Sequence, residues 1–164
     1  RQNILSLKYV TQAGGKLKKD LVEEFYKICS RKNVDFIVMY GQTEATSRMS
    51  YLPTKYLPEK AGSIGIAIPN GKFSIINELG EEIKENFKSG ELIYSGKNVS
   101  MGYAQSYEDL NLEDINNGIL HTGDIAQFDE DGFFYIVGRK KRFVKIYGNR
   151  VNLDEIEHML KKYG

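Results

Sequence analysis

Three polar side chains, those of Gln42, Thr43 and Glu44, directly follow an apolar run and a glycine in the stretch DFIVMYGQTEAT. An apolar, β-branched and aromatic run that stops at a glycine is typical of a buried strand that leads into a tight turn. The polar groups would then lie at the carboxyl end of the strand, where open α/β sheets usually bind their ligands.

The same stretch contains the groups that a nucleoside triphosphate requires. Tyr40 offers a flat ring for a base, and Gly41 lets the backbone approach a ligand closely. Thr43 supplies a hydroxyl for a phosphate oxygen, and Glu44 supplies a hard oxygen ligand for Mg²⁺. The alternative is a strand, a turn and a polar patch in contact with water, because a short motif also occurs by chance.

The composition argues against several classes of protein. The 164 residues are 41% apolar and 27% charged, which indicates a folded chain of one domain or slightly more. With a net charge of +1, no overall field attracts nucleic acid or an anionic membrane. The one cysteine, Cys29, is expected to be a small buried apolar residue, and two histidines, His121 and His158, make a histidine-based zinc site unexpected.

The sequence also bears on location. No apolar stretch approaches the length of a bilayer span, and the first ten residues lack the pattern of a signal peptide, which favours a cytoplasmic protein without a transmembrane segment. Because the chain begins with Arg1 rather than methionine, we expect it to be part of a longer protein.

A strand–helix–strand pattern surrounds the polar stretch. A strand is predicted for residues 4–11, and Gly14 and Gly15 after it would allow close approach to a ligand, with a plain loop as the alternative. Apolar residues at helical spacing predict a helix over residues 17–32. Together with the apolar run before the polar stretch, this is the βαβ pattern of a parallel sheet. Residues 47–60, which contain two prolines, are predicted to be a loop.

Short strands punctuated by glycine follow the α/β layer. They are predicted for residues 63–68, 72–77, 91–95, 125–128, 133–137 and 143–147, with hairpin turns at residues 78–81 and 129–132. This spacing suggests a small barrel or a twisted sheet beside the α/β layer. Asn152 and Glu155 form a capping-box pattern for a final helix, and the domain that it begins is expected to continue past residue 164. The expected fold class is therefore α/β, or α+β within this fragment.

Four motifs in one order make the chain resemble the adenylate-forming superfamily, which includes acyl-CoA synthetases, luciferases and the adenylation domains of peptide synthetases. They are YGQTEA from Tyr40, GELIYSG from Gly90 with Gly102-Tyr103, HTGDI from His121, and Gly138-Arg139 with the later KIYGNRV and EIE. The resemblance implies an enzyme that activates a carboxylic acid with ATP to an acyl adenylate and then passes the acyl group to a thiol. Cations and oriented donors must offset the repulsion between the carboxylate and the phosphate oxygens.

The resemblance also implies roles for individual residues. Tyr40, Gly41 and Gln42 would belong to the nucleotide site, with the Tyr40 ring on adenine. Thr43 would hold the α-phosphate region, and Glu44 would carry Mg²⁺.

Three further positions complete the implied nucleotide site. Asp124 would accept both ribose hydroxyls; the alternative is the polar end of a strand. Arg139 would also reach the ribose, or it is a solvated basic turn. Gly14 and Gly15 resemble the glycine-rich loop that lies beside the adenine and the acyl pocket.

The resemblance further divides the chain. Residues 1–60 would end an α/β nucleotide-binding subdomain, residues 61–137 would form a β subdomain, and residues 143–164 would begin the C-terminal domain. Residues 138–142 would be the hinge about which that domain rotates, with Lys141 at the pivot.

Two residues after the hinge match family positions. Lys145 matches a lysine that faces the active site during thioester formation in some members, or it is a solubilising charge. Gly148 matches the glycine that lines the pantetheine tunnel.

The implied partners are a small carboxylic acid and coenzyme A, or the phosphopantetheine of an acyl carrier protein. A non-catalytic nucleotide-binding scaffold is a further alternative. The family's phosphate loop, which would precede Arg1, and its C-terminal lysine are not among these 164 residues, so this segment alone is expected not to adenylate an acid. The sequence predicts neither the acid nor the oligomeric state.

Overall fold

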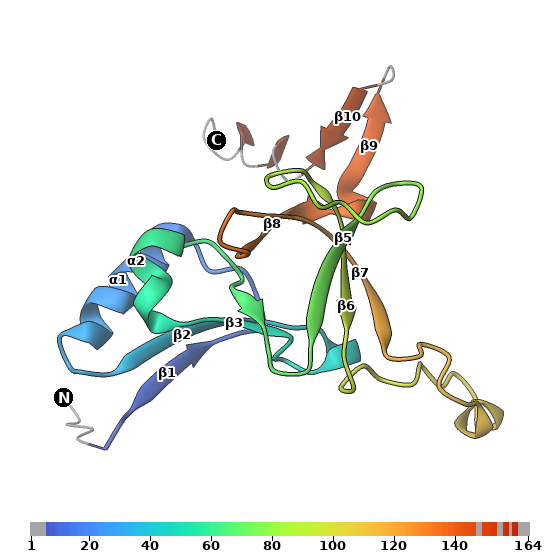
Figure 1. The fold of residues 1–164 in the computed structure, drawn as a ribbon, viewed down its shortest axis with the longest axis horizontal. Coiled ribbons are helices and arrows are strands. Elements are labelled where there is room, and N and C mark those ends of the chain that lie inside the picture. The colour runs from blue at the N-terminus through green and yellow to red at the C-terminus, as the bar shows by residue number, and fades with distance from the viewer. Residues whose placement is uncertain (1–5, 147–148, 154–155, 158, 161–164) are drawn as a thin grey trace.

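The computed structural model describes residues 6–146, 149–153, 156–157 and 159–160. In these ranges the strands form two four-stranded sheets and one two-stranded sheet (Figure 1). None of the helices described there combines the length and the apolar character that a membrane span needs.

The first sheet contains the predicted strand–helix–strand unit. Its strands, in spatial order, are β1 (Tyr9–Gln12), β2 (Asp35–Tyr40), β3 (Ser50–Leu52) and β4 (Ile66–Ala67). Helix α1 (Lys19–Ser30) joins β1 to β2, and these two strands pair in parallel, which confirms the βαβ prediction. β3 and β4 extend the sheet in antiparallel fashion.

The prediction of a loop over residues 47–60 is wrong. The segment forms β3, the 3₁₀ turn η2 (Thr54–Tyr56) and the short helix α2 (Leu57–Lys60). Leu52 of β3 is fully buried, so packing and pairing with its neighbours stabilise a strand too short to show an apolar period. Pro58 lies in the first turn of α2, where its missing amide donor costs no helical hydrogen bond.

The second sheet is antiparallel and open. Its strands, in order, are β5 (Lys72–Ile76), β6 (Gly90–Ser95), β7 (Ile119–Phe128) and β8 (Phe134–Arg139). Within the described residues no barrel closes, so the sheet alternative of the prediction applies. β7 begins well before the predicted residue 125, because irregularities in its register with β6 and β8 let the strand continue through Gly123, whose φ is +68°.

The third sheet is a hairpin at the end of the chain. It consists of β9 (Phe143–Ile146) and β10 (Asn149–Asn152). β9 confirms the strand predicted over residues 143–147 as far as residue 146, and residue 147 lies outside the described residues. Helical residues follow β10, in the segment of the predicted final helix, although Glu155 of the capping box lies outside the described ranges. The remaining short 3₁₀ turns are η1 (Thr43–Ala45), η3 (Glu108–Asn111) and η4 (Lys140–Arg142).

Two apolar clusters form the core, and each draws residues from more than one sheet. The first lies between the helices and the first sheet, and it includes Phe36 and Cys29, which is buried as predicted. Phe133, just before β8, belongs to this cluster and packs edge-on against Tyr56, with ring centroids 4.9 Å apart. The second cluster surrounds Tyr94 of β6 and includes the fully buried Met49 from the loop after β2.

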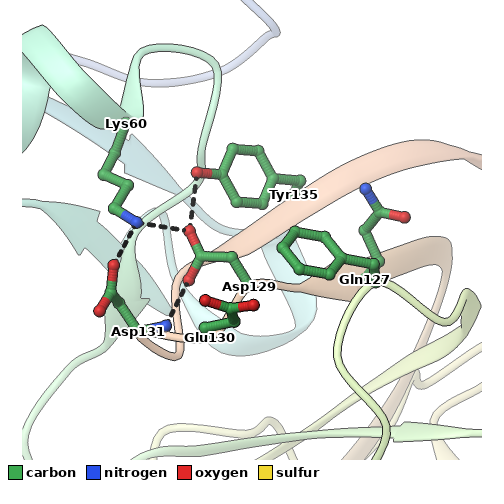
Figure 2. A pocket seen from close by; sticks show the side chains of 7 residues that line it. Lys60, Gln127, Asp129, Glu130, Asp131 and Tyr135 are labelled. Atoms are coloured by element: carbon green, nitrogen blue, oxygen red, sulfur yellow. Dashed lines mark hydrogen bonds and ion pairs between the residues drawn. The ribbon is translucent and has the colours of Figure 1, made fainter.

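An ion-pair cluster fastens α2 to the turn between β7 and β8 (Figure 2). Lys60 Nζ lies 2.9 Å from Asp129 Oδ2 and 2.5 Å from Asp131 Oδ2. Tyr135 donates a hydrogen bond of 3.0 Å to the same Asp129 oxygen, and the Phe133 amide donates one of 2.9 Å to Asp129 Oδ1. The cluster borders a cavity of about 300 Å³. Because its charged groups are paired with one another, we assign it a structural role.

The pKa of Asp129 lies below its ordinary value of 3.8. Burial disfavours the charged carboxylate, but hydrogen bonds from Lys60, the Phe133 amide and Tyr135 outweigh burial. Burial and the bond to Asp129 raise the pKa of Tyr135 to about 12. A lowered folded-state pKa means that Asp129 stabilises the fold fully above its unfolded pKa of about 3.9, and that this stabilisation is lost as the pH falls through the folded-state value.

We therefore expect Asp129→Asn to lower the free energy of unfolding of the full-length protein by about 2 kcal/mol at pH 7, because it leaves the Lys60 charge with a weaker partner. The difference from the wild type should shrink as the pH falls below about 4. Urea unfolding across this pH range measures it. Glu130→Gln is the matched control, since Glu130 is exposed and makes none of the contacts drawn in Figure 2. An Asp129 effect that is equally large at pH 3 would contradict this account.

Candidate functional site

The polar stretch follows β2 directly, as the sequence predicts, and η1 holds Thr43 and Glu44. Gly41 is required there by the protein's own backbone, because a Cβ at this position would overlap the backbone of Thr46 to Arg48. The chain folds back so that the Met49 amide donates to the Tyr40 carbonyl at 2.8 Å. Close approach to a ligand at Gly41 stays a prediction.

Asp124 of β7 lies at the centre of the polar contacts around this turn. It is 3% exposed, and its register partner on β8 is Arg139, whose Nε lies 3.0 Å from Asp124 Oδ1. Tyr40 donates to Asp124 Oδ2 at 2.6 Å, and Gln42 Nε2 donates to the same oxygen at 3.0 Å. Three of the predicted site residues, Tyr40, Gln42 and Arg139, therefore contact the buried carboxylate of a fourth, Asp124.

The Tyr40 hydroxyl is a permanent donor in this arrangement. Burial, and then the hydrogen bond to the Asp124 carboxylate, raise the pKa of Tyr40 far above its ordinary value. Its ring packs against Phe73 of the second cluster, with centroids 6.2 Å apart. Stacking of this ring on adenine stays a prediction, since the described contacts of Tyr40 are with the core, with Asp124 and with Gln42.

Gln42 and Thr122 connect the turn to β7. Gln42 Nε2 donates to the Thr122 carbonyl at 3.0 Å, in addition to its bond with Asp124. The Thr122 hydroxyl donates to the Leu92 carbonyl at 2.7 Å and accepts the Asp124 amide at 3.1 Å. The sequence motif contained Thr122 without assigning it a task; the structure shows that it supports Asp124.

Glu44 is held by a different part of the chain. The Tyr103 hydroxyl donates to Glu44 Oε1 at 2.7 Å, and the Ser100 amide donates to the Glu44 carbonyl at 2.7 Å. The hydrogen bond from Tyr103 lowers the pKa of Glu44 most, and a hydrogen bond from the backbone amide of Glu44 itself lowers it further. The carboxylate is therefore charged at neutral pH. Gly102-Tyr103 belongs to the second sequence motif, but the motif predicts no role for Tyr103.

The groups in η1 fit a magnesium ion that arrives with phosphate. Mg²⁺ is usually bound by one or two carboxylates, by waters and by substrate phosphates rather than by a full set of protein ligands. Glu44 is ionised and half-buried, and two donors leave some of the roughly four acceptor positions of its carboxylate available. The exposed Thr43 adjoins it. Among the described residues no group of three or more histidine, cysteine or acidic side chains offers a separate metal cage.

The glycine loop lies beside β8. Gly14 has a φ of +86°, and both Gly14 and Gly15 are exposed, with open space where a Cβ would be. Gln12 Nε2 donates to the Gly15 carbonyl at 2.6 Å, and Lys16 Nζ donates to the Ile136 carbonyl of β8 at 3.3 Å. The loop therefore contacts the strand that ends at Arg139.

An ion pair also fixes the residue after Arg139. Lys140 Nζ donates to Glu91 Oε2 at 2.7 Å, and the Glu91 side chain is only 10% exposed. His121 Nδ1 lies 3.7 Å from the other Glu91 oxygen. Of the two residues predicted beyond the hinge, Lys145 lies on β9 opposite Arg150, and Gly148 lies outside the described residues.

Comparisons with known proteins agree with this geometry. A 2-succinylbenzoate–CoA ligase of Bacillus cereus is 34% identical over 155 residues, which cover 94% of this chain and 31% of the relative. The unliganded O-succinylbenzoate coenzyme A synthetase of Bacillus subtilis superposes with a TM-score of 0.74 at 28% identity, over 94% of this chain and 33% of that one.

The structure of the B. subtilis synthetase in complex with ATP and magnesium ion gives a TM-score of 0.73 at 27% identity, over 93% of this chain and 31% of that one. The chain thus spans about a third of the length of the relatives that it matches. The model of the AMP-binding enzyme family matches residues 1–104. This match, together with the four ordered motifs and the shared fold, confirms the resemblance to adenylate-forming enzymes: the chain belongs to the AMP-binding enzyme family.

Proposed function

We propose that the full-length protein activates a carboxylic acid with ATP, releases pyrophosphate, and transfers the acyl group from the adenylate to coenzyme A. The observation that carries this proposal is the placement of two carboxylates around the turn after β2, Glu44 in η1 and Asp124 on β7. Glu44 is ionised and accessible, whereas Asp124 is buried among oriented donors. The names of the relatives, which are CoA ligases, support the same chemistry.

The two carboxylates have different tasks in this proposal. Glu44 binds Mg²⁺, which supplies positive charge that offsets the phosphate oxygens, and the Thr43 hydroxyl donates to the α-phosphate region. Asp124 accepts the ribose hydroxyls. Because Arg139 already pairs with Asp124 Oδ1, the ribose shares this carboxylate with the guanidinium rather than meeting a free one.

The adenine end of the proposed site involves Tyr40 and the glycine loop. Tyr40 offers a ring beside Asp124, and Lys16, which follows Gly14 and Gly15, connects the glycine loop to β8. We propose that the base lies between this glycine loop and the turn after β2. The acid is not assigned, although 2-succinylbenzoate belongs in any panel of candidates because the B. cereus relative is named for it.

Two ion pairs favour Lys141 as the pivot of the proposed hinge. Arg139 is tied to Asp124, and Lys140 is tied to the nearly buried Glu91, so both are fixed to the second sheet. Lys141 is exposed in η4, and rotation that begins there breaks neither pair. Lys145 and Gly148 would then approach the site in the rotated state, next to the thiol acceptor.

A carrier protein instead of coenzyme A remains the alternative acceptor, and a non-catalytic nucleotide-binding scaffold is the alternative to an enzyme. The acceptor is decided by offering the preformed acyl adenylate both coenzyme A and a phosphopantetheinylated carrier. The ionised, accessible Glu44 and the donors arranged around Asp124 argue against the scaffold, because a site without chemistry has no need of an accessible charged carboxylate.

In the natural full-length protein, Glu44→Ala should reduce acid-dependent ATP–pyrophosphate exchange by about 100-fold or more, because the metal-bound phosphates lose their carboxylate ligand. A panel of carboxylic acids that includes 2-succinylbenzoate identifies the substrate class in the same assay. Glu24→Ala is the control, since Glu24 is an exposed carboxylate on α1, away from the turn. ATP binding without exchange for any acid would favour the scaffold.

Lys141→Pro should separate the two half-reactions. Residues of a 3₁₀ turn have φ near −60°, which proline also adopts, so proline holds φ of residue 141 near this value and disfavours any state that requires a different one. Proline also disfavours the helical conformation of Lys140 before it, which Lys141→Ala does not. We expect one half-reaction to fall about 100-fold and the other to change less than about threefold. Single-turnover assays of adenylate formation and of thioester formation measure this, with Lys141→Ala as the control. Equal effects on both half-reactions would show that residue 141 is not the pivot.

A further inference from the structure

Gly102 and Tyr103 continue the motif that starts at Gly90, and the proposed chemistry assigns them no task. Tyr103 is 66% exposed, yet its hydroxyl reaches across to the Glu44 carboxylate and donates to Oε1 at 2.7 Å. An exposed tyrosine gains little from burial here, so its position depends on the loop that carries it.

The first part of this loop is anchored to the core by hydrogen bonds, and it also donates hydrogen bonds to η1. Tyr94 is fully buried, and its hydroxyl donates to Asn98 Oδ1 at 2.8 Å. Asn98 Nδ2 in turn donates to the Ala45 carbonyl at 2.6 Å, and the Ser100 amide donates to the Glu44 carbonyl at 2.7 Å. The backbone of η1 is therefore fixed by the same loop that presents Tyr103.

The end of the loop is fixed as well. Gly102 has a φ of +144°, and a Cβ there would lie 2.8 Å from the Ile115 side chain, so the chain needs glycine to turn at this point. The Ile115 amide donates to the Met101 carbonyl at 3.0 Å, and Asn116 Nδ2 donates to the Ser100 carbonyl at 2.7 Å. These contacts direct Tyr103 back toward Glu44.

We propose that Tyr103 is a positioning residue that orients the Glu44 carboxylate for the divalent cation of the nucleotide complex. This inference rests on the proposed function. The Tyr103 hydroxyl occupies a lone pair of Oε1 and restricts the carboxylate to one orientation, which leaves Oε2 directed to the cation with little ordering left to occur on binding. Tyr103 touches neither the cation nor the phosphates; it acts through Glu44.

The test uses the natural full-length protein and two matched variants. Tyr103→Phe removes only the hydroxyl, and Tyr107→Phe removes the hydroxyl of a more exposed tyrosine in the same segment, for which the structure describes no hydrogen bond with the site. Electron paramagnetic resonance measures Mn²⁺ binding in the presence of α,β-methylene-ATP, and calorimetry measures binding of the same analogue in EDTA.

Tyr103→Phe should weaken Mn²⁺ binding by about five- to tenfold, with less than about a twofold change in EDTA, and Tyr107→Phe should change neither. Both variants should unfold at the wild-type urea concentration, since one exposed hydroxyl is removed. In a Glu44→Ala background, Tyr103→Phe should have no further effect on Mn²⁺ binding, because the carboxylate that it orients is gone.

Wild-type Mn²⁺ affinity in Tyr103→Phe, or an equal loss with and without Glu44, would overturn the positioning role and leave the proposed function standing. A Tyr103→Phe effect that is equally large in EDTA would also overturn it, because the loop would then shape the nucleotide site as a whole. If the wild-type protein binds no Mn²⁺ with the analogue, the proposed function fails and the inference fails with it.

Discussion

The arrangement of the site depends on one buried charge. Asp124 is 3% exposed, and a carboxylate removed from water in this way is costly unless donors surround it. Its donors are Tyr40 at the end of β2, Gln42 in the following turn and Arg139 at the end of β8. A shift of the first sheet against the second would leave this charge short of a partner. The contacts of Asp124 therefore fix the position of the two sheets relative to each other, and they also fix the turn that contains Thr43 and Glu44.

Glu44, the second carboxylate, is positioned independently of the first. The contacts of Glu44 come from the loop that contains Ser100 and Tyr103, and those of Asp124 come from strands. This separation leaves Asp124 desolvated among three donors, while Glu44 is half-buried and keeps acceptor positions for the proposed cation. The ion pairs of Arg139 and Lys140 then extend the fixed part of the molecule as far as η4. The proposed rotation of the C-terminal domain therefore requires freedom only after that point.

Local sequence patterns predicted the elements that local chemistry determines. The apolar run that ends at Tyr40 and Gly41 gave the strand and the turn, and helical spacing gave α1. The local patterns failed for elements that strand pairing determines. β3 has only three residues, and β7 continues through an irregular register at Gly123. The residues alone suggested Glu44 as a Mg²⁺ ligand, with a polar patch in contact with water as the alternative, and the motif resemblance supplied the candidate role of Asp124.

The side-chain contacts between residues of different motifs could not be predicted from the sequence. Tyr103 and Glu44 are 59 positions apart, and Lys60 and Asp129 are 69 positions apart, and no local pattern states which of many tyrosines or lysines meets which carboxylate. Gly41 illustrates the same limit, because its glycine was expected to serve a ligand and is already required by the backbone of Thr46 to Arg48.

The central claim is that Asp124, held by its three donors, receives the ribose of the nucleotide. Its most direct test compares the binding of ATP and of 2′,3′-dideoxy-ATP to the full-length protein and to its Asp124→Asn variant by calorimetry. The account predicts that the wild type prefers ATP by about tenfold or more and that the variant loses this preference, because the hydroxyls have lost the charged acceptor. An undiminished preference in the variant would show that the ribose is recognised elsewhere and would contradict the account.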